Sequence, residues 1–346
     1  MRDFWEGKRV LVTGHTGFKG LWLAKWLDMV GASVAGYSLP PDQYSLYWKL
    51  AFSGRFQNNF GDVRDADSLR KTVCSFKPEI VFHLAAHAIV REAWLDPAGA
   101  FSSNVMGTVN LLEVLRGLTS LKAVVVVTSD KVYENVETNR PYTEADRLGG
   151  DEPYAASKAA AELAVSAYRN AYFKSGPGVA TARASNVYGG GDMHFDRLIP
   201  HLIRAKISGE PAELRNPDSV RPWQYILDPL NGYISLARHL YGNPVKFSGC
   251  WNFGPPEGEL CTVGEIFSLL LGGKSTARRT EENFYEAGLL LLDSKKSMSG
   301  LGWRPVVNLE TGLSECVSFY RGLFGGEDAT ALMESEISRY MKKLGA

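Results

Sequence analysis

Short apolar runs alternate with segments of helical periodicity over the first half of the chain. Five such runs are predicted to be strands, at residues 9–13, 33–37, 80–84, 123–127 and 179–183, and a further strand, third in chain order, is predicted to end at about 61–65. The clearest is the run at 123–127, in which four valines follow Ala123 with no polar alternation, the pattern of a strand buried on both faces. Helical patterns lie between the strands, at about 21–27, 97–115 and 159–172. We therefore predict an α/β fold with a Rossmann-type, doubly wound parallel sheet.

The regular alternation stops after residue 183. A helix over 229–240 and a strand over 250–253 are expected to rejoin the sheet, and the remaining chain mixes helix and strand patterns. No repeat, low-complexity segment or linker separates these parts. The predicted domains are a Rossmann-type domain of residues 1–183 and 228–254 and a smaller mixed α/β domain of residues 184–227 and 255–346.

The composition limits the partners. Of the 346 residues 45% are hydrophobic, and the 38 basic side chains balance the 38 acidic ones. Because the net charge is zero, we expect no nucleic-acid partner and no anionic membrane surface. No signal peptide is recognised, and no apolar run approaches the ~20 residues that span a bilayer, so we expect a cytoplasmic location. The four cysteines lack CxxC or metal-ligand spacing, which predicts reduced thiols and no metal site.

Three glycines follow the first predicted strand directly. Gly14, Gly17 and Gly20 are spaced GxxGxxG between the strand at 9–13 and the helical pattern at 21–27. Glycine permits a tight turn there and lets backbone N–H groups approach a pyrophosphate at the helix N-terminus. A simple turn is the alternative, but the position between a strand and a helix favours a dinucleotide site.

The ends of the second and third strands leave the details of that site open. The strand at 33–37 is followed by neither the acidic residue typical of NAD sites nor an arginine for NADP, so it does not choose between the two. Asp62 is predicted either to contact the adenine or to belong to the cap of the next helix, at Asp65 or Asp67.

The strand that begins at Ile80 runs into small residues. Ala85 and Ala86 would let the backbone pass close to a cofactor. His83 lies within the apolar run and is interpreted as a core histidine with satisfied hydrogen bonds. His87 lies nearer the crevice and is a candidate for substrate contact.

The valine-rich strand ends in a hydroxyl, a carboxylate and an amine. Ser129, Asp130 and Lys131 follow it directly. Ligands of open parallel sheets bind beyond the carboxyl ends of the strands, which would place these three side chains over the crevice. The alternative is a polar loop in which Ser129 or Asp130 caps the next helix.

Tyr154 and Lys158 lie four residues apart at the start of a helix and so share one helix face. A nearby ammonium lowers the pKa of a phenol, which suits the tyrosine to accept a proton from an alcohol during hydride transfer. A YxxxK pair alone is usually a solvated face, but behind a glycine fingerprint and Ser129 it favours a redox site.

Two arginines in the second half are candidates for a phosphate clamp. Arg215 and Arg221 stand beside Asn216 and Trp223, and guanidinium groups match phosphate oxygens in a bidentate way. The alternative is that both are ordinary surface arginines.

These residues together resemble a known family. The glycine fingerprint with Ser129, Tyr154 and Lys158 is similar to the extended short-chain dehydrogenase/reductase superfamily of sugar-nucleotide enzymes. Residues 13–20 (TGHTGFKG) and 128–131 (TSDK) resemble, more narrowly, CDP-glucose 4,6-dehydratases. Further segments that share this likeness are 186–187, 189–192, 197–200, 215–217, 221–224 and 301–303. The chain departs from the family pattern at His87, Ala88, Ser185, Tyr188 and Met193.

The resemblance implies a redox-neutral dehydration of a sugar nucleotide, CDP-glucose, with NAD as a cofactor that takes a hydride from C4 and returns it to C6. Tyr154, assisted by Lys158 and Ser129, is expected to take the proton of the 4-hydroxyl. Lys131 would remove the C5 proton while Asp130 protonates the leaving 6-hydroxyl. A 4-epimerase or reductase needs no such acid and base, and a non-catalytic NAD-binding scaffold needs none of these groups, so both remain weaker alternatives.

The resemblance also implies the binding residues and a homodimer whose seam is formed by the helices near 97–115 and 153–172. The residues predicted to contact NAD are Gly14, Thr16, Gly17, Phe18, Lys19, Gly20, Asp62, Val63, Leu84, Ala85, Ala86, Asn104, Tyr154 and Lys158. The residues predicted to contact the substrate are His87, Asn186, Arg197, Leu198, Arg215, Asn216, Arg221 and Trp223.

Overall fold

The apolar runs form one seven-stranded sheet in which every neighbouring pair of strands is parallel. This computed structural model describes residues 2–194, 197–214, 216–255, 259–272, 276–277 and 288–345. The strands lie in the order β11-β6-β5-β4-β1-β2-β3. Their bounds are β1 Arg9–Thr13, β2 Ser33–Ser38, β3 Gln57–Phe60, β4 Ile80–His83, β5 Ala123–Val127, β6 Gly178–Ala184 and β11 Gly249–Phe253. The predicted Rossmann-type sheet is confirmed, and the strand expected near 250–253 joins it beside β6.

The side chains of the sheet alternate between two hydrophobic cores, one on each face. In β5, Val125 belongs to one core while Val124 and Val126 belong to the other. Helices cover both faces, so no face of these strands needs polar residues, which explains the continuous valine run. The chain order reverses between β1 and β4, and the loops that leave these two strands diverge there. This reversal places a ligand crevice at the carboxyl ends of β1 and β4.

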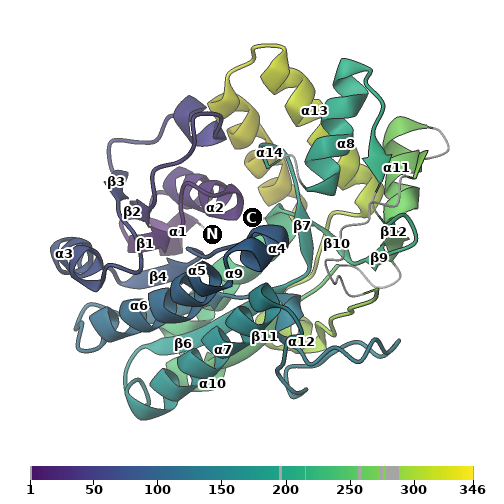
Figure 1. Cartoon of the computed structure of the whole chain (residues 1–346). Coiled ribbons are helices and arrows are strands. Elements are labelled where there is room, and N and C mark those ends of the chain that lie inside the picture. The colour runs from purple at the N-terminus through teal and green to yellow at the C-terminus, as the bar shows by residue number, and fades with distance from the viewer. Residues whose placement is uncertain are drawn as a thin grey trace.

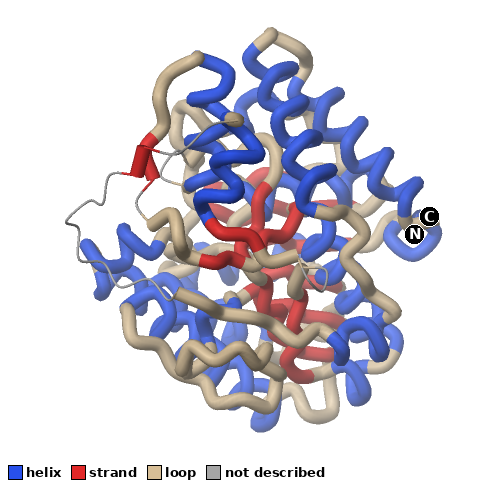
Figure 2. Tube along the Cα trace, turned by 90° about the vertical axis from the view of Figure 1, so that its right-hand side faces the viewer, coloured by secondary structure: helices blue, strands red, loops and turns tan. Residues whose placement is uncertain are grey.

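The helices form a layer on each face of the sheet (Figure 2). One layer contains α2 (Phe18–Met29) and α9 (Leu227–Gly242), which pack on β1, β2, β5 and β6. The other contains α3 (Ala66–Phe76), α6 (Gly107–Leu115) and α7 (Pro153–Ala171). Shorter helices complete these layers: α1 (Arg2–Trp5), η1 (Leu46–Lys49), α4 (Val90–Leu95) and α10 (Pro244–Phe247). The two ends of the described chain lie close together in both ribbon views (Figures 1 and 2).

The helix predicted over 97–115 is continuous but not uniform. It consists of α5 (Pro97–Phe101), a π-helical turn η2 (Ser102–Met106) and α6. Asp96 caps its start and accepts a hydrogen bond from the Gly99 amide at 2.9 Å. A π-helical turn inserts an extra residue into a helix and is frequent at functional sites. Here it turns Asn104 inward, where its side chain is 2% exposed.

Short strands and the C-terminal helices are built onto the carboxyl edge of the sheet (Figure 1). The strands pair as β7 (Asn186–Tyr188) with β10 (Trp223–Tyr225), β9 (Val220–Arg221) with β12 (Cys261–Thr262), and β8 (Glu213–Leu214) with β13 (Thr276–Ala277). The helices are α8 (Leu198–Ser208), α11 (Val263–Leu271), α12 (Lys295–Leu301), α13 (Leu309–Phe324) and α14 (Ala329–Lys343).

The second part of the chain shares its core with the first. Helix α14 packs against α2 of the sheet layer, and one hydrophobic cluster runs from Trp26 in α2 to Tyr340 in α14. The division into two discontinuous domains therefore stays a prediction. The four cysteines are unpaired, as expected, and within the described ranges no helix is long and apolar enough to cross a membrane.

A buried carboxyl in α14 predicts how stability depends on pH. Glu336 is 3% exposed, and burial raises its pKa from 4.5 to about 8. Between these two values the unfolded chain is ionised while the folded chain keeps the proton. Stability therefore falls as pH rises through this window, by ~1.4 kcal/mol per pH unit. Because glutamine cannot ionise, Glu336→Gln should match the parent near pH 5 and be about 3 kcal/mol more stable at pH 7.

Urea unfolding at pH 5, 7 and 8 measures this effect. Glu210→Gln is the control, because Glu210 is exposed and its loss should leave the pH dependence unchanged. An identical pH dependence in Glu336→Gln and the parent would show that Glu336 is not the group responsible.

Candidate active site

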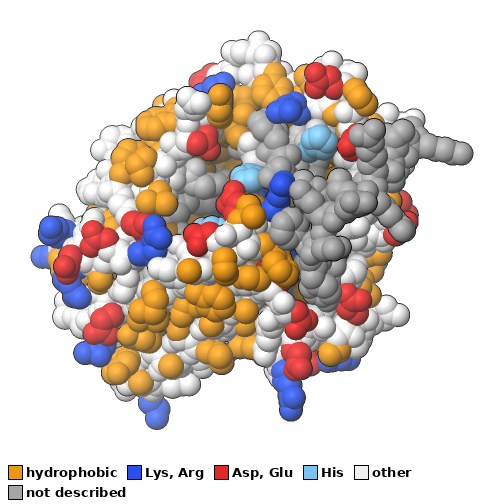
Figure 3. Space-filling model, in the orientation of Figure 1, with side chains coloured by type: hydrophobic (Ala, Val, Ile, Leu, Met, Phe, Trp, Pro, Cys, Tyr) orange, Lys and Arg blue, Asp and Glu red, His pale blue; other side chains and the backbone are white. Residues whose placement is uncertain are grey.

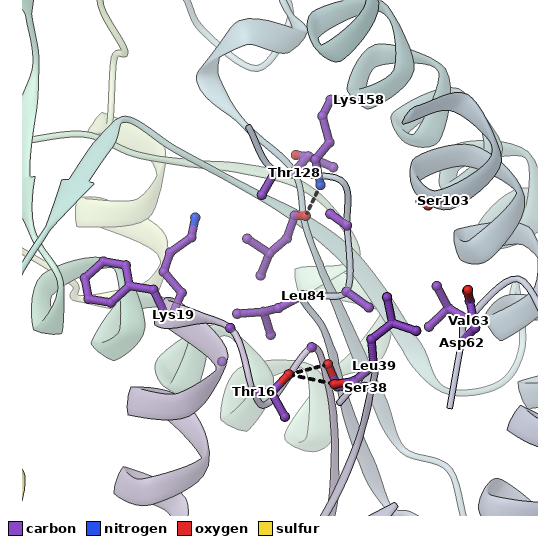
Figure 4. Close-up of a pocket in the computed structure, with 18 of the residues that line it drawn as sticks. Thr16, Lys19, Ser38, Leu39, Asp62, Val63, Leu84, Ser103, Thr128 and Lys158 are labelled. Carbon is purple, nitrogen blue, oxygen red and sulfur yellow. Dashed lines mark hydrogen bonds between the residues drawn. The ribbon is translucent and has the colours of Figure 1, made fainter. Parts of the chain in front are cut away.

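A cavity of about 300 Å³ lies where the fold predicts it, at the carboxyl ends of the central strands. The glycine loop after β1 lies on one side and the start of α7 on the other (Figure 4). Thirteen of the fourteen residues predicted to contact NAD line this cavity; only Asn104 does not. Among the described residues, no group of three or more His, Cys, Asp or Glu side chains could hold a metal ion.

The glycine loop packs its backbone directly against neighbouring backbone, which only residues without a Cβ allow. The space in front of the loop is therefore left for a ligand. Gly14 has φ +75°, and a Cβ there would lie 2.6 Å from the amide nitrogen of Ala85. A Cβ on Gly20 would overlap the carbonyl oxygen of Gly14. Helix α2 begins after Gly17, which offers no side-chain cap to the first N–H groups. A pyrophosphate at this helix N-terminus would fit these unfilled donors.

The structure shows which residue caps α3, one of the alternatives left open for Asp62. Asp65 caps α3 by accepting hydrogen bonds from the amides of Asp67 and Ser68. Asp62 does not cap the helix; it lines the cavity, and Arg64 holds its carboxylate at 2.6 and 2.9 Å. This hydrogen bonding by Arg64 lowers the pKa of Asp62. Asp62 is therefore an ionised acceptor suited to the hydroxyl or amino groups of an adenosine.

The other wall of this end is neutral. Ser38, at the end of β2, lies 2.7 Å from the hydroxyl of Thr16 in the glycine loop (Figure 4). Neither an acid nor an arginine occupies this strand end, as the sequence indicated, so the choice between NAD and NADP is not made by charge here.

The turn after β5 brings both predicted roles of Ser129 together. Ser129 caps the short helix η3 (Asp130–Val132) by accepting a hydrogen bond from the Lys131 amide at 3.3 Å. Its hydroxyl also donates to Asp130 at 3.0 Å and lies within hydrogen-bonding reach of the Tyr154 phenol. Ser129 is thus a helix cap and a neighbour of the candidate base.

Asp130 is buried in this turn with 5% of its surface exposed. Burial raises the pKa of its carboxyl, and the neighbouring Lys131 and Ser129 offset only part of that effect. A carboxyl whose pKa is raised keeps its proton closer to neutral pH, as a general acid must. Lys131 is half-buried at the same turn.

Helix α7 begins so that the face with Tyr154 and Lys158 meets the cavity. Pro153 occupies the first turn, and Glu152 caps the helix by accepting hydrogen bonds from the amides of Tyr154 and Ala155, both at 2.7 Å. Lys158 donates to the carbonyl of Val127, the last residue of β5, at 3.3 Å (Figure 4). The helix is thereby fixed to β5, the strand that leads into the turn of Ser129, Asp130 and Lys131.

The expected lowering of the Tyr154 pKa by Lys158 is not found. Burial raises the pKa of Tyr154 to about 12, and the hydrogen bond between Tyr154 and Ser129 offsets part of that rise. Desolvation, aided by the nearby charge of Lys19, lowers the pKa of Lys158 to about 7. Lys158 thus loses much of the positive charge on which the prediction depended, because its amine is buried beside a second lysine.

Two basic side chains from different elements, Arg197 and Lys19, reach one wall of the cavity. Arg197, just before α8, lines the cavity and donates to Asp192 at 2.8 Å. Lys19 extends from α2 into the cavity, and desolvation, aided by Arg197, lowers the pKa of its amine to about 8. Leu198 is the first residue of α8. Negative charge on a substrate would be attracted to this wall.

Other predicted substrate residues are dispersed. Asn186 pairs with Trp223 between β7 and β10, but Trp223 is 8% exposed and its indole donates to the carbonyl of Cys261 at 3.2 Å. Asn216 lines a second hollow of about 310 Å³ beside Gly288. The Arg221 guanidinium donates to the Gly288 carbonyl at 3.5 Å.

These substrate residues therefore do not all face one cavity. Arg215 lies outside the described residues. The predictions for this group stay open.

Asn104 and the histidines have supporting positions. Asn104 accepts a hydrogen bond from the His87 amide at 2.8 Å and donates to Ser157 at 2.8 Å. It therefore ties the segment after β4 to the start of α7, behind the cavity wall, instead of facing a cofactor. His83 lies 2.7 Å from the Thr13 hydroxyl, and burial lowers its pKa to about 3. The interpretation of His83 as a neutral core histidine is confirmed.

Three cavity residues with polar side chains were not among the predicted contacts: Ser38, Ser103 and Thr128. Each was visible only by its position beside a predicted residue, since Ser38 and Thr128 stand at strand ends and Ser103 precedes Asn104. Strand-end position was therefore the one signal that could have identified two of them.

Comparisons with known proteins agree with this geometry. The chain is 43% identical to a CDP-glucose 4,6-dehydratase of Salmonella typhimurium, over 98% of each sequence. It is 29% identical to a UDP-glucose 4-epimerase of Mycolicibacterium smegmatis, over 90% of this chain and 98% of that one. The crystal structure of DesIV, a dTDP-glucose 4,6-dehydratase from Streptomyces venezuelae with NAD and TYD bound, matches 93% of this chain and 99% of that one with a TM-score of 0.79 and 27% identity.

The family model described as "NAD dependent epimerase/dehydratase family" matches residues 10–246. This range includes β1, the glycine loop, the turn of residues 129–131 and α7. Since this match covers more than half of the sequence, the chain belongs to the NAD dependent epimerase/dehydratase family.

Proposed function

We propose that this protein is a CDP-glucose 4,6-dehydratase that converts CDP-glucose to CDP-4-keto-6-deoxyglucose with NAD as a resident cofactor. The observation that carries the proposal is the catalytic turn, residues 129–131: Asp130 and Lys131 stand in the same turn as Ser129, which lies beside Tyr154. An epimerase or reductase needs a proton acceptor at one hydroxyl, whereas elimination of water needs an additional acid and base. The 43% identity to the Salmonella dehydratase supports the same choice.

The residues that would hold NAD fit the group. Gly14 and Gly20 clear the space for a pyrophosphate, the open N-terminus of α2 supplies donors, and Asp62 supplies an acceptor for adenosine. When bound, NAD would accept a hydride from C4 of the sugar and later deliver it to C6.

Tyr154 would accept the proton of the sugar 4-hydroxyl. Its phenol is buried within reach of Ser129, so a bound alcohol could be shared between the two hydroxyls. Lys158 fixes the helix to β5 and adds positive charge below about pH 7, where its amine is protonated. The result of this step is a ketone at C4, which acidifies the proton on C5.

Lys131 and Asp130 would then divide the elimination. Lys131 would take the C5 proton, and Asp130, whose pKa is raised by burial, would give a proton to the 6-hydroxyl as water leaves. The bond from C6 to oxygen breaks as the C5–C6 double bond forms, which leaves Lys131 protonated and Asp130 ionised. As a hydride is returned to C6, Lys131 would give a proton back to C5, which completes the 4-keto-6-deoxy sugar. A cytoplasmic location and a cytidine nucleotide belong to the same proposal.

The test is to incubate the purified protein with CDP-glucose and, separately, with dTDP-, UDP- and GDP-glucose in deuterated water. Mass spectrometry should show loss of one water and gain of one deuteron at C5 with CDP-glucose, without net consumption of added NADH. A changed C4 configuration, or net turnover of NADH, would instead assign an epimerase or reductase. Dehydration of another nucleotide sugar alone would correct the substrate and keep the reaction.

We also propose that two copies associate through the α4–α7 face. Apolar side chains are exposed on the adjacent helices of this face: Leu95, Phe101, Met106, Leu163 and Tyr172. Figure 3 shows hydrophobic side chains gathered over α5, α6 and α7. An apolar patch of this kind marks an interaction surface, and the helices are those expected to form a dimer seam.

Leu163→Glu is expected to convert the dimer to a monomer, because Leu163 is 61% exposed in α7 and a charge there would be buried in the seam. Light scattering coupled to size-exclusion chromatography measures the mass. Val245→Glu is the control, since Val245 is 85% exposed in α10, away from this face. A parent protein that is monomeric at micromolar concentration would contradict the proposal.

A further inference from the structure

The face of α7 that carries Tyr154 and Lys158 continues with a third ionisable residue. Glu162 follows Lys158 by four residues, which places it one helical turn further along the same face. It is 4% exposed and forms a bidentate ion pair with Arg183 of β6, with Nε to Oε1 and Nη2 to Oε2 both at 2.9 Å. The proposed reaction gives neither residue a role. A buried ion pair is weak evidence for stability alone, because desolvation cancels much of its attraction.

The pair is attached to both ends of the catalytic turn. On the N-terminal side, the hydroxyl of Thr128 donates to Glu162 at 2.6 Å. On the C-terminal side, Arg183 donates to the phenol oxygen of Tyr133 at 2.8 Å, and that phenol donates to Asn252 at 2.7 Å. Ser129, Asp130, Lys131 and Val132 are the residues between these two attachments.

The backbone holds both ends of this turn. The parallel ladder ends where the Thr128 amide donates to the carbonyl of Ala182. At the other end, Tyr133 forms an isolated antiparallel bridge with Leu148, and the Gly149 amide donates to the Val132 carbonyl at 2.9 Å. Side-chain bonds to Glu162 and Arg183 add a second attachment at each of these two ends.

We propose that the Glu162–Arg183 pair is a positioning device for the elimination step, which holds Asp130 and Lys131 in register with the sugar through Thr128 and Tyr133. The inference rests on the dehydratase function proposed above. Acid and base must lie within hydrogen-bond reach of their protons, so a displacement of ~1 Å is enough to reduce a rate about 100-fold. Of the groups for C4 oxidation, Tyr154 and Lys158 stand on α7 itself and only Ser129 lies in the turn, so oxidation should suffer less than elimination.

Thr181 provides a matched control within the same cluster. Its hydroxyl donates to the other oxygen of Glu162 at 2.7 Å, and it is also buried. It lies in the middle of β6, however, and has no link to the catalytic turn. Thr128→Val and Thr181→Val therefore remove the same kind of bond from the same carboxylate, but only the first releases the turn.

The expected result is a selective loss in elimination. Thr128→Val should lower kcat for water loss by about 30- to 100-fold with KM changed less than threefold, whereas Thr181→Val should keep kcat within threefold. Both variants should lose a similar amount of thermal stability. In quenched single turnovers, Thr128→Val should accumulate sugar that has lost two hydrogens, the C4-oxidised species, before sugar that has lost water. Thr128→Ser keeps the hydroxyl and should restore the parent rate.

Tyr133→Phe tests the other attachment and guards against a folding failure of Thr128→Val. It should give the same accumulation of oxidised sugar. Equal kcat values in Thr128→Val, Tyr133→Phe and Thr181→Val would reduce the pair to a structural element. If the parent protein dehydrates no nucleotide sugar, the proposed function fails first, and that outcome is distinct from failure of this inference.

Discussion

Asp130→Asn is expected to oxidise the sugar at C4 but to lose water elimination, with kcat for dehydration reduced about 1,000-fold. Asparagine has nearly the shape of aspartic acid and can still accept the hydrogen bond from Ser129. It cannot give up a proton to the 6-hydroxyl. The step needs a proton on this carboxyl, and burial raises the pKa of Asp130, which favours the protonated form. The variant therefore loses the proton donor but keeps the hydrogen bond and the conformation of the turn at residues 129–131.

Mass spectrometry of quenched reactions measures the two steps separately. Asp130→Asn should yield sugar lighter by two hydrogens and almost none that has lost water. Asp67→Asn, which changes an exposed carboxylate in α3, should behave as the parent does. An equal loss of oxidation and dehydration in Asp130→Asn would assign Asp130 a structural role and return Lys131 to an ordinary loop residue.

The parts of the fold that the sequence predicted are those with local causes. Four valines can be covered on both sides only in a parallel sheet between helix layers, and β5 has the predicted bounds. The glycine spacing predicted a close approach of the backbone, and Gly14 does lie against Ala85. Such features need only neighbouring residues, so a single sequence suffices to find them.

The missed features depend on contacts between distant segments. Asn104 was expected to face the cofactor, but its partners His87 and Ser157 lie 17 and 53 residues away. Glu162 was passed over within a helix pattern, although Arg183 in a buried strand gave a signal. An arginine in such a strand requires an acidic partner. Helical spacing correctly placed Tyr154 and Lys158 on one face but could not show that the Lys158 amine turns toward Val127.

Tyr154→Phe is expected to abolish both steps, with less than a thousandth of the parent rate for C4 oxidation as well as for dehydration. The phenol is the group beside Ser129 that can take the proton of a bound 4-hydroxyl, and phenylalanine preserves the ring that lines the cavity. Without oxidation the C5 proton is not acidified, so Lys131 and Asp130 have no reaction to complete. The pattern should therefore differ from Asp130→Asn, in which oxidation survives.

The pKa values of Tyr154 and Lys158 make Lys158 a rival proton acceptor, which this experiment can distinguish from Tyr154. Burial raises the pKa of Tyr154 to about 12 and lowers that of Lys158 to about 7, so near neutral pH the lysine is the more easily deprotonated group. If Lys158 itself were the proton acceptor, Tyr154→Phe would retain C4 oxidation, and the rate would rise with pH through about 7. Tyr168→Phe removes a phenol from the same helix outside the cavity and should leave both steps intact. Loss of oxidation in Tyr154→Phe alone would assign the proton transfer to the phenol and leave Lys158 to hold α7 against β5.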